Sequence, residues 1–340
     1  MTVSIGPLQP QEVPAFCTLF QRVFSVSLTP DLRQWKYEQG PRLGSVSLVA
    51  RDASGALVGH AGALIFPGTY QGRMLPMAQV CDVMVEAEAR GGLDAGGTYG
   101  RLMQALQHEL ARRHPGVLAY GFAGIRPYKL GARMGLYRAV QECRMGFLED
   151  LPPAGGSEAA AVSAAMASLQ KAWGTTAPWT WAAQRAEWDH PAFAQLWARW
   201  GARSECPRVQ RTPAYLHWRY ASHPQHRYQP WLLRRWAQAQ GWVVTRELPD
   251  GSHCLVDSLL PAGLTPVHAA QAVQRSLSAP ASVPTRAHSC LPPSPRVSSW
   301  DIRTEVSARL EPIMACEVLV DRWHSDQVTP QFQPGDTDVF

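Results

Sequence analysis

The sequence predicts an α/β protein built from two tandem domains of similar fold. Three observations support this prediction: the chain has 340 residues, strand-like and helix-like patterns alternate along its first half, and two blocks from that half recur later. At about 100–200 residues per domain, a chain of this length is expected to hold two domains. The expected division is a first domain over 1–150, a linker over 151–178 that is rich in Ala, Ser and Gly, and a second domain over 179–340.

The first half begins with two helical patterns and continues with strands and helices. Apolar residues at helical spacing favour the first helix, and Thr29 followed by Pro30 supplies the N-cap and first-turn proline of the second. The turn at 52–55 separates two apolar runs, which is typical of a hairpin. The expected elements are, in chain order, helices over 14–20 and 30–37, strands over 45–51, 56–66 and 77–85, a helix over 98–112, a strand over 116–122, a helix over 127–134 and a strand over 139–148.

Two blocks of the first half recur in the same order in the second half. Residues 14–20 and 191–197 both begin Pro-Ala-Phe, at an offset of 177 residues. Residues 29–37 and 212–220 share Thr-Pro at the start and an aromatic pair around a basic residue at the end, at an offset of 183. Matching order at similar offsets indicates an internal duplication. The copies have diverged, because Trp35 is the only one of 13 tryptophans within the first 170 residues.

Composition and charge exclude several classes of function. The 32 basic and 27 acidic residues give a net charge of +5, but only 17% of residues are charged and the basic ones are scattered. We therefore expect no nucleic-acid groove and no membrane-binding patch. Seven scattered cysteines favour a reducing cytoplasm, and the N-terminus does not resemble a signal peptide. No metal site is expected, because His217, His223 and His226 lack a carboxylate or cysteine at ligand spacing.

The segment over 79–103 carries the strongest functional pattern. An apolar strand is followed by a turn with Arg90 and then by several glycines that continue into a helix. Glycines let backbone N–H groups approach an anion, and a helix N-terminus adds about half a positive charge. This order of elements favours a phosphate or pyrophosphate cradle; a glycine-rich loop that binds nothing is the alternative. The missing Gly-Lys-Ser/Thr run excludes a nucleotide-hydrolysing P-loop.

This segment resembles the GNAT superfamily of acetyl-CoA-dependent N-acyltransferases. Their signature is an apolar strand, a turn with Arg-Gly-x-Gly, and a helix, and residues 83–92 fit it as far as the second glycine. The loop then runs longer than the usual motif, through 93–100, before the helix begins. The resemblance covers about 1–150 and implies, in each copy, a mixed, mostly antiparallel sheet flanked by helices.

The resemblance also implies acetyl-CoA as co-substrate, with its pyrophosphate on the glycine loop and its pantetheine arm between the strands over 77–85 and 116–122. A backbone N–H near Val83 or Val85 would polarise the thioester carbonyl. The residues expected to bind the co-substrate are Val83, Val85, Arg90, Gly91, Gly92, Gly96, Gly97, Thr98, Tyr99 and Gly100.

The implied reaction is acyl transfer to a primary amine of a small-molecule acceptor by direct attack. Asp82 is the best candidate for the general base, because a carboxylate inside an apolar strand is costly unless it is partnered or functional. The alternative is a structural Asp that caps a turn or pairs with an arginine. His60 and Glu86 are weaker candidates, and the C-terminal carboxylate of Phe340 is a further one.

Two more roles follow from the resemblance. Gly131 stands where the family usually has the tyrosine that protonates the leaving thiolate, so Tyr128, one helical turn earlier, is the candidate acid. The acceptor is expected beside Trp35 and Tyr37, in the cleft between the two copies. A non-catalytic protein that binds acyl-CoA remains an alternative because of Gly131.

The second copy is expected to be degenerate. Residues 254–261 take the place of the strand that carries Cys81 and Asp82, but no Arg-Gly pair and no run of glycines follows them. A transferase of the same fold that uses aminoacyl-tRNA is a further alternative. The Arg90-Gly91-Gly92 run and the absence of a basic groove count against it.

Overall fold

The structure is a computed structural model that describes residues 3–92, 96–147, 181–236, 238–248, 253–264, 266–278, 297–301 and 314–319. The predicted linker over 151–178 and the C-terminal Phe340 lie outside these described residues. Within them, no helix is both long enough and apolar enough to cross a membrane.

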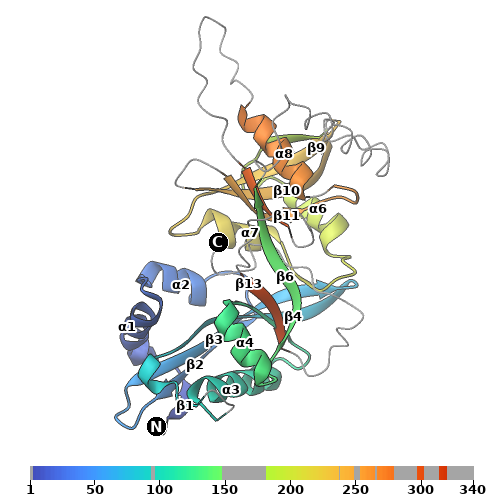
Figure 1. Cartoon of the computed structure of the whole chain (residues 1–340). Coiled ribbons are helices and arrows are strands. Elements are labelled where there is room, and N and C mark those ends of the chain that lie inside the picture. The colour runs from blue at the N-terminus through green and yellow to red at the C-terminus, as the bar shows by residue number, and fades with distance from the viewer. Residues whose placement is uncertain are drawn as a thin grey trace, which may run out of the picture.

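The first half contains a short first strand that was not predicted, β1, followed by the predicted elements in the predicted order (Figure 1). They are β1 (Ser4–Pro7), α1 (Val13–Phe24), α2 (Pro30–Glu38), β2 (Gly44–Arg51), β3 (Leu57–Tyr70), β4 (Arg73–Val85), α3 (Thr98–Arg113), β5 (Leu118–Ala123), α4 (Ile125–Arg133) and β6 (Arg138–Phe147). One difference is that β3 and β4 form a longer hairpin than expected, closed by Gln71 and Gly72 at φ 49° and 73°. Left-handed dihedrals at both central residues suit the twist of a two-residue hairpin turn.

The second half repeats much of this order, with the extra short strand β8. Its first two α-helices are short, and each continues into a π-helical turn, Trp197–Gly201 and His217–Ala221. Its elements are β7 (Ala182–Arg185), α6 (Ala192–Leu196), β8 (Arg208–Val209), α7 (Pro213–Leu216), β9 (Tyr228–Arg235), β10 (Gln238–Glu247), β11 (His253–Leu259), α8 (Pro266–Ser278), β12 (Val297–Asp301) and β13 (Met314–Leu319). The Thr-Pro motif caps α2 and α7 identically, because the Thr29 and Thr212 hydroxyls each accept an N–H from three residues later at 3.2 Å. This common cap supports the duplication.

The two copies share one sheet, in the order β1-β2-β3-β4-β5-β13-β6-β12-β11-β10-β9-β7. The pairs β4–β5 and β11–β12 are parallel and the other pairs along this order are antiparallel, so the sheet is mixed and mostly antiparallel as expected. Strand β13, near the end of the chain, lies between β5 and β6, and β6 pairs on its other edge with β12. Each copy therefore completes its sheet with a strand from the other, and β6 runs from one copy to the other (Figure 1).

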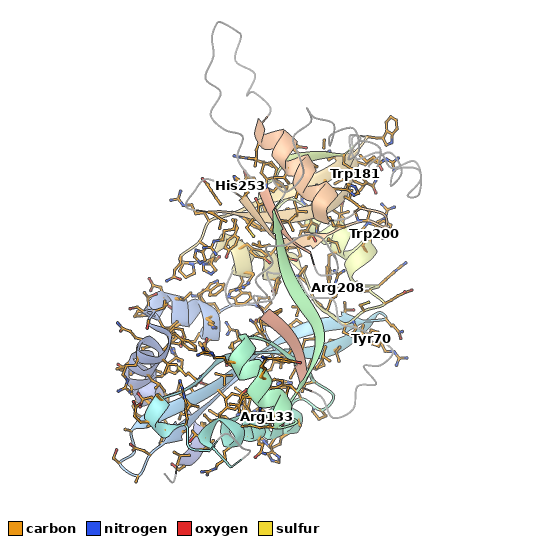
Figure 2. All side chains as sticks on the ribbon, in the orientation of Figure 1. Tyr70, Arg133, Trp181, Trp200, Arg208 and His253 are labelled. Atoms are coloured by element: carbon orange, nitrogen blue, oxygen red, sulfur yellow. The ribbon has the colours of Figure 1, made fainter. Side chains whose placement is uncertain are left out.

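Helices cover both faces of the first part of this sheet. On one face, Leu102 and Leu106 of α3 are buried against the sheet. On the other face, Phe16 of α1 and Trp35 of α2 belong to a core cluster that continues into the second copy. The copies also meet where the short strand β8 pairs with the end of β3, near Tyr70 and Arg208 in Figure 2.

Candidate functional site

The predicted pantetheine channel corresponds to a point where two parallel strands part. Strands β4 and β5 pair from Met77 opposite Leu118 to Val80 opposite Gly121. Strand β4 then continues to Val85, and this last stretch has no register with β5. The edge of β4 that faces β5 is therefore open beyond Val80, where the sequence places the arm of the co-substrate.

A bulge lies in this open part of β4. His60 and Gly62 pair with Met84 and Cys81, so β4 holds one more residue than β3 across the same interval. Asp82 takes the left-handed conformation there, with φ 50°, which costs about 1–2 kcal/mol for a residue other than glycine. The bulge therefore needs contacts that hold it in place.

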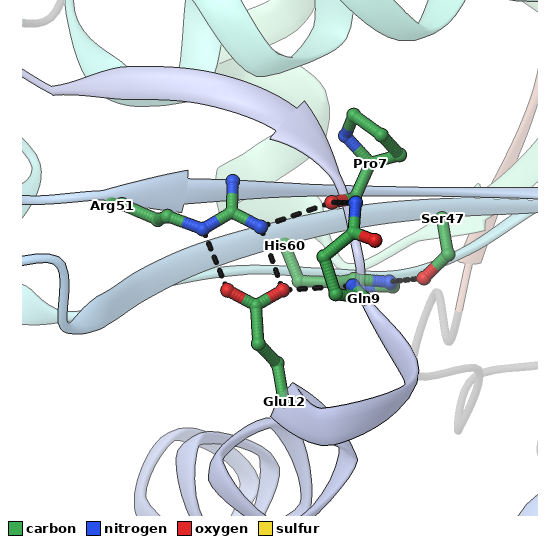
Figure 3. A network of polar contacts seen from close by, with 6 residues as sticks. All are labelled: Pro7, Gln9, Glu12, Ser47, Arg51 and His60. Carbon is green, nitrogen blue, oxygen red and sulfur yellow. Dashed lines mark hydrogen bonds and ion pairs between the residues drawn. The ribbon is translucent and has the colours of Figure 1, made fainter.

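His60 holds the bulge from the neighbouring strand. Its Nδ1–H donates to the carbonyl oxygen of Asp82 at 2.7 Å, and its Nε2 accepts from the Ser47 hydroxyl at 2.7 Å, as Figure 3 shows for Ser47. These two bonds fix the neutral tautomer. Burial lowers the pKa of His60, so the ring is uncharged at neutral pH. In the same figure, Arg51 of β2 pairs with Glu12 at 2.7 and 2.6 Å, which fastens the start of α1 to the sheet.

The Asp82 carboxylate is held by two residues of α2. The Lys36 ammonium donates to Oδ1 at 2.7 Å and the Tyr37 hydroxyl donates to Oδ2, and the Asp82 side chain is only 4% exposed. Burial by itself raises the pKa of Asp82, but the charge and hydrogen bond of Lys36 and the bond from Tyr37 outweigh it and lower that pKa. The geometry therefore matches the partnered-Asp alternative, but the partner is a lysine and not the expected arginine.

The glycine loop stays compact although it is longer than the family motif. The Thr98 N–H donates to the Arg90 carbonyl at 3.3 Å, and the Thr98 hydroxyl donates to the Ala89 carbonyl at 2.6 Å. Gly97 lies so close to Gly92 that a Cβ on it would overlap the Gly92 carbonyl oxygen. The two ends of the extra segment therefore meet, and Arg90-Gly91-Gly92 lies at the N-terminus of α3. Residues 93–95 lie outside the described residues.

Three tyrosines gather between α3 and α4. The hydroxyls of Tyr99 and Tyr137 lie 2.8 Å apart, and Tyr137 donates to the Pro127 carbonyl at 2.6 Å. The Tyr128 ring stacks on Tyr137, with centroids 6.3 Å apart. A Cβ at Gly131 would overlap the Tyr137 ring, so Tyr137 fills the space that a side chain at Gly131 would need. Sequence reasoning missed Tyr137; the signal was Gly131 itself, because glycine inside a helix often marks a close neighbour.

The two residues expected beside the acceptor are buried. Trp35 and Tyr37 are 4% and 9% exposed, and both make hydrogen bonds within the protein. In this structure they therefore pack beneath Asp82 and the contact between the copies, and they do not line an open cleft. An open pocket of about 590 Å³ does exist around Arg185 and Gln229, but its strands β7 and β9 lie at the opposite end of the sheet from β4.

The second copy keeps the buried carboxylate but not the glycine loop. Asp257 of β11 accepts from the Tyr220 hydroxyl at 2.7 Å and from Arg211 at 2.9 Å, and it is fully buried. The segment between β11 and α8 contains one glycine, Gly263. A copy without the glycine loop thus retains the Asp–Tyr contact, which favours a structural role for that contact in both copies.

Comparison with known proteins agrees with this fold. Residues 4–138 match the family model described as acetyltransferase (GNAT) domain. No curated protein matches the chain in sequence. Among solved structures, a probable N-acyltransferase from Enterococcus faecalis V583 is similar, with 14% identity, TM-score 0.61, and coverage of 94% of this chain and 72% of that one.

Two other solved structures are similar over most of the chain. A GCN5-related N-acetyltransferase from Kribbella flavida shares 14% identity at TM-score 0.59, covering 93% of this chain and 71% of that one. A tandem GNAT protein from the clavulanic acid biosynthesis pathway shares 13% identity at TM-score 0.51, covering 93% and 98%. GNAT domains use acetyl-CoA as acyl donor. Residues 4–138 therefore match the acetyltransferase (GNAT) domain family, and the fold of the chain as a whole is similar to that of a tandem GNAT protein.

Proposed function

We propose that the first domain transfers an acetyl group from acetyl-CoA to a primary amine of a small-molecule acceptor by direct attack. The observation that carries the proposal is the parting of β4 and β5 beyond Val80 and Gly121, directly before the loop at the N-terminus of α3. An open parallel edge beside a helix N-terminus suits an amide-containing arm that ends in a pyrophosphate.

Each part of this site has a proposed role. Backbone N–H groups at Val83 or Val85 polarise the thioester carbonyl, and the N-terminus of α3 binds the pyrophosphate. The residues proposed to form the cradle are Arg90, Gly91, Gly92, Gly96, Gly97, Thr98, Tyr99 and Gly100. Gly91 fits this role because its φ of 65° favours glycine, and a Cβ there would lie at an ordinary contact distance of 3.8 Å from the Gly97 Cα.

The proton donor for the leaving group is proposed to be Tyr128. The amine nitrogen bonds to the carbonyl carbon and releases one proton to water, the C–S bond breaks, and the thiolate takes the Tyr128 proton, which Tyr128 regains from solvent. Tyr99 and Tyr137 bond to each other, whereas the Tyr128 hydroxyl has no partner within the described ranges. Asp82 is proposed as a positioning residue rather than as the base, because both of its oxygens already accept hydrogen bonds.

Calorimetry with acetyl-CoA tests the proposed site. Gly91→Asp should reduce affinity at least tenfold, because it adds a negative charge where a pyrophosphate is expected and strains a left-handed residue. Gly72→Asp is the matched control: Gly72 has φ 73°, lies in open space and belongs to the β3–β4 turn. Equal affinities for the wild type and both variants would refute the site.

Turnover is tested separately by following free thiol release with a panel of small primary amines. Tyr128→Phe should lower kcat about tenfold or more and leave the KM for acetyl-CoA unchanged. Acetyl-CoA binding without acetylation of any amine would favour the non-catalytic alternative instead. Among the described residues, Cys17, Cys81, Cys206 and Cys254 form no disulfide, and the proposed location is the cytoplasm.

A further inference from the structure

Two tryptophans related by the duplication form a reciprocal contact where the copies meet. The Trp35 indole N–H donates to the Trp218 carbonyl at 2.8 Å, and the Trp218 indole N–H donates to the Trp35 carbonyl at 3.0 Å. Their rings stack with centroids 5.0 Å apart and planes 18° apart. Both side chains are buried. The contact therefore joins α2 to its counterpart in the second copy by the same bond in each direction.

In each copy the residues that follow this tryptophan hold the buried carboxylate. Lys36 and Tyr37 come directly after Trp35 and both bind Asp82. Tyr220 comes two residues after Trp218 and binds Asp257. The backbone of α2 between Trp35 and Tyr37 is also held by Arg42, which donates to the Lys36 carbonyl at 2.6 Å. A shift of Trp35 would consequently move the two groups that hold Asp82.

Asp82 connects a shift of Trp35 to the proposed acyl-CoA site. It occupies the strained position of the β4 bulge, at φ 50°, and Val83 follows it on the open edge of the strand. A strained dihedral persists only where its surroundings enforce it. Direct contacts thus run from Trp218 through Trp35, Lys36 and Tyr37 to the bulge.

We propose that Trp218, a residue of the copy without a phosphate loop, is a positioning residue for acetyl transfer in the first domain. It holds α2 in the position in which Lys36 and Tyr37 bind Asp82. The bulge then keeps the backbone N–H groups that follow it directed toward the thioester carbonyl. The proposal rests on the proposed function. It means that the second copy, which lacks the glycine loop, positions α2 of the first domain for that reaction.

Trp218→Phe tests the proposal in the full chain. It removes the indole N–H that binds Trp35 and keeps an aromatic ring in the stack. Trp242→Phe is the matched control, since Trp242 is also buried in the second copy but its indole N–H has no partner within the described residues. We expect Trp218→Phe to lower kcat/KM for acetyl-CoA about fivefold, the change that loss of one hydrogen bond worth about 1 kcal/mol produces. Trp242→Phe, compared at the same thermal stability as Trp218→Phe, should change kcat/KM for acetyl-CoA less than twofold.

An Asp82→Asn background separates positioning from general stability. If Trp218 acts through Asp82, Trp218→Phe should have no further effect on kcat/KM once Asp82→Asn is present. A fivefold loss that recurs unchanged in this background would overturn the proposal, as would equal kcat/KM for Trp218→Phe and Trp242→Phe.

If Trp218→Phe does not fold, Trp35→Phe replaces it, because it removes the opposite bond of the same pair. The same fivefold loss, absent in the Asp82→Asn background, is expected of it. A wild-type protein that neither binds nor turns over acetyl-CoA would instead refute the proposed function, so the two failures are distinguishable.

Discussion

Replacing Lys36 by Met would leave Asp82 as a buried carboxylate without its cation. The two side chains are 10% and 4% exposed, and Lys36 is the ion-pair partner of Asp82 at 2.7 Å. Removing one partner of a buried pair costs about 3–5 kcal/mol, because the remaining charge is desolvated. The variant should therefore be severely destabilised at neutral pH.

The carboxyl group can limit this cost by taking up a proton. Neutralising a carboxyl group of ordinary pKa near 3.9 costs about 4 kcal/mol at pH 7 and about 1.5 kcal/mol at pH 5. In the variant the pKa of Asp82 is raised, so its stability should increase as the pH falls from 7 to 5. In the wild type the pKa of Asp82 is lowered, and the stability from the pair is lost only as the pH falls through that lowered pKa.

Urea unfolding followed by tryptophan fluorescence at pH 7 and pH 5 measures both effects. Arg22→Met is the control, because Arg22 is 57% exposed in its pair with Glu86 and its loss should cost under about 1 kcal/mol. Adding Asp82→Asn to the Lys36 variant should recover most of the stability at pH 7 by removing the buried charge. A Lys36 variant that unfolds like the Arg22 variant at both pH values would refute the assignment of a buried, charged pair.

Three further predictions concern stability. Gly131→Ala should lower the thermal midpoint, because overlap with the Tyr137 ring costs about 1–3 kcal/mol. If that overlap is the cause, the double variant with Tyr137→Ala should lose less stability than the sum of the two single losses. Thr29→Ala and Thr212→Ala should each cost about 1 kcal/mol in chemical unfolding, and unequal losses would contradict equivalent caps. Because burial lowers the pKa of His60, the unfolded chain binds a proton that the folded chain does not. Stability should therefore fall as the pH drops below about 6.5, and His60→Gln should reduce that slope in a pH series of melts.

The order of elements and the duplication could be predicted from local patterns. Thr29-Pro30 specifies a cap and first turn wherever it occurs, and the same pair at Thr212-Pro213 produces the same hydrogen bond. The strand, glycine loop and helix over 79–103 are likewise local, since glycine's freedom and helix geometry act within a few residues. These features were sufficient to predict the GNAT resemblance.

The partners of the site residues could not be predicted in the same way. Asp82 looked equally suited to catalysis or to pairing until the fold brought Lys36 and Tyr37, 46 and 45 residues away, onto its two oxygens. Gly131 looked like a lost tyrosine until Tyr137 was found to fill its space. In both cases the role of a residue depends on a neighbour that local spacing does not specify.

The sequence by itself predicted two copies of one α/β fold and determined that only the first carries a run of glycines between a strand and a helix, because caps, periodicity and glycine loops are properties of short segments. Only the tertiary structure decided that β6 and β13 complete each other's sheets and that Trp218 meets Trp35 across the boundary. Such contacts join residues up to about two hundred positions apart, and they form because the whole chain gains from burying unpaired strand edges and large aromatic surfaces together.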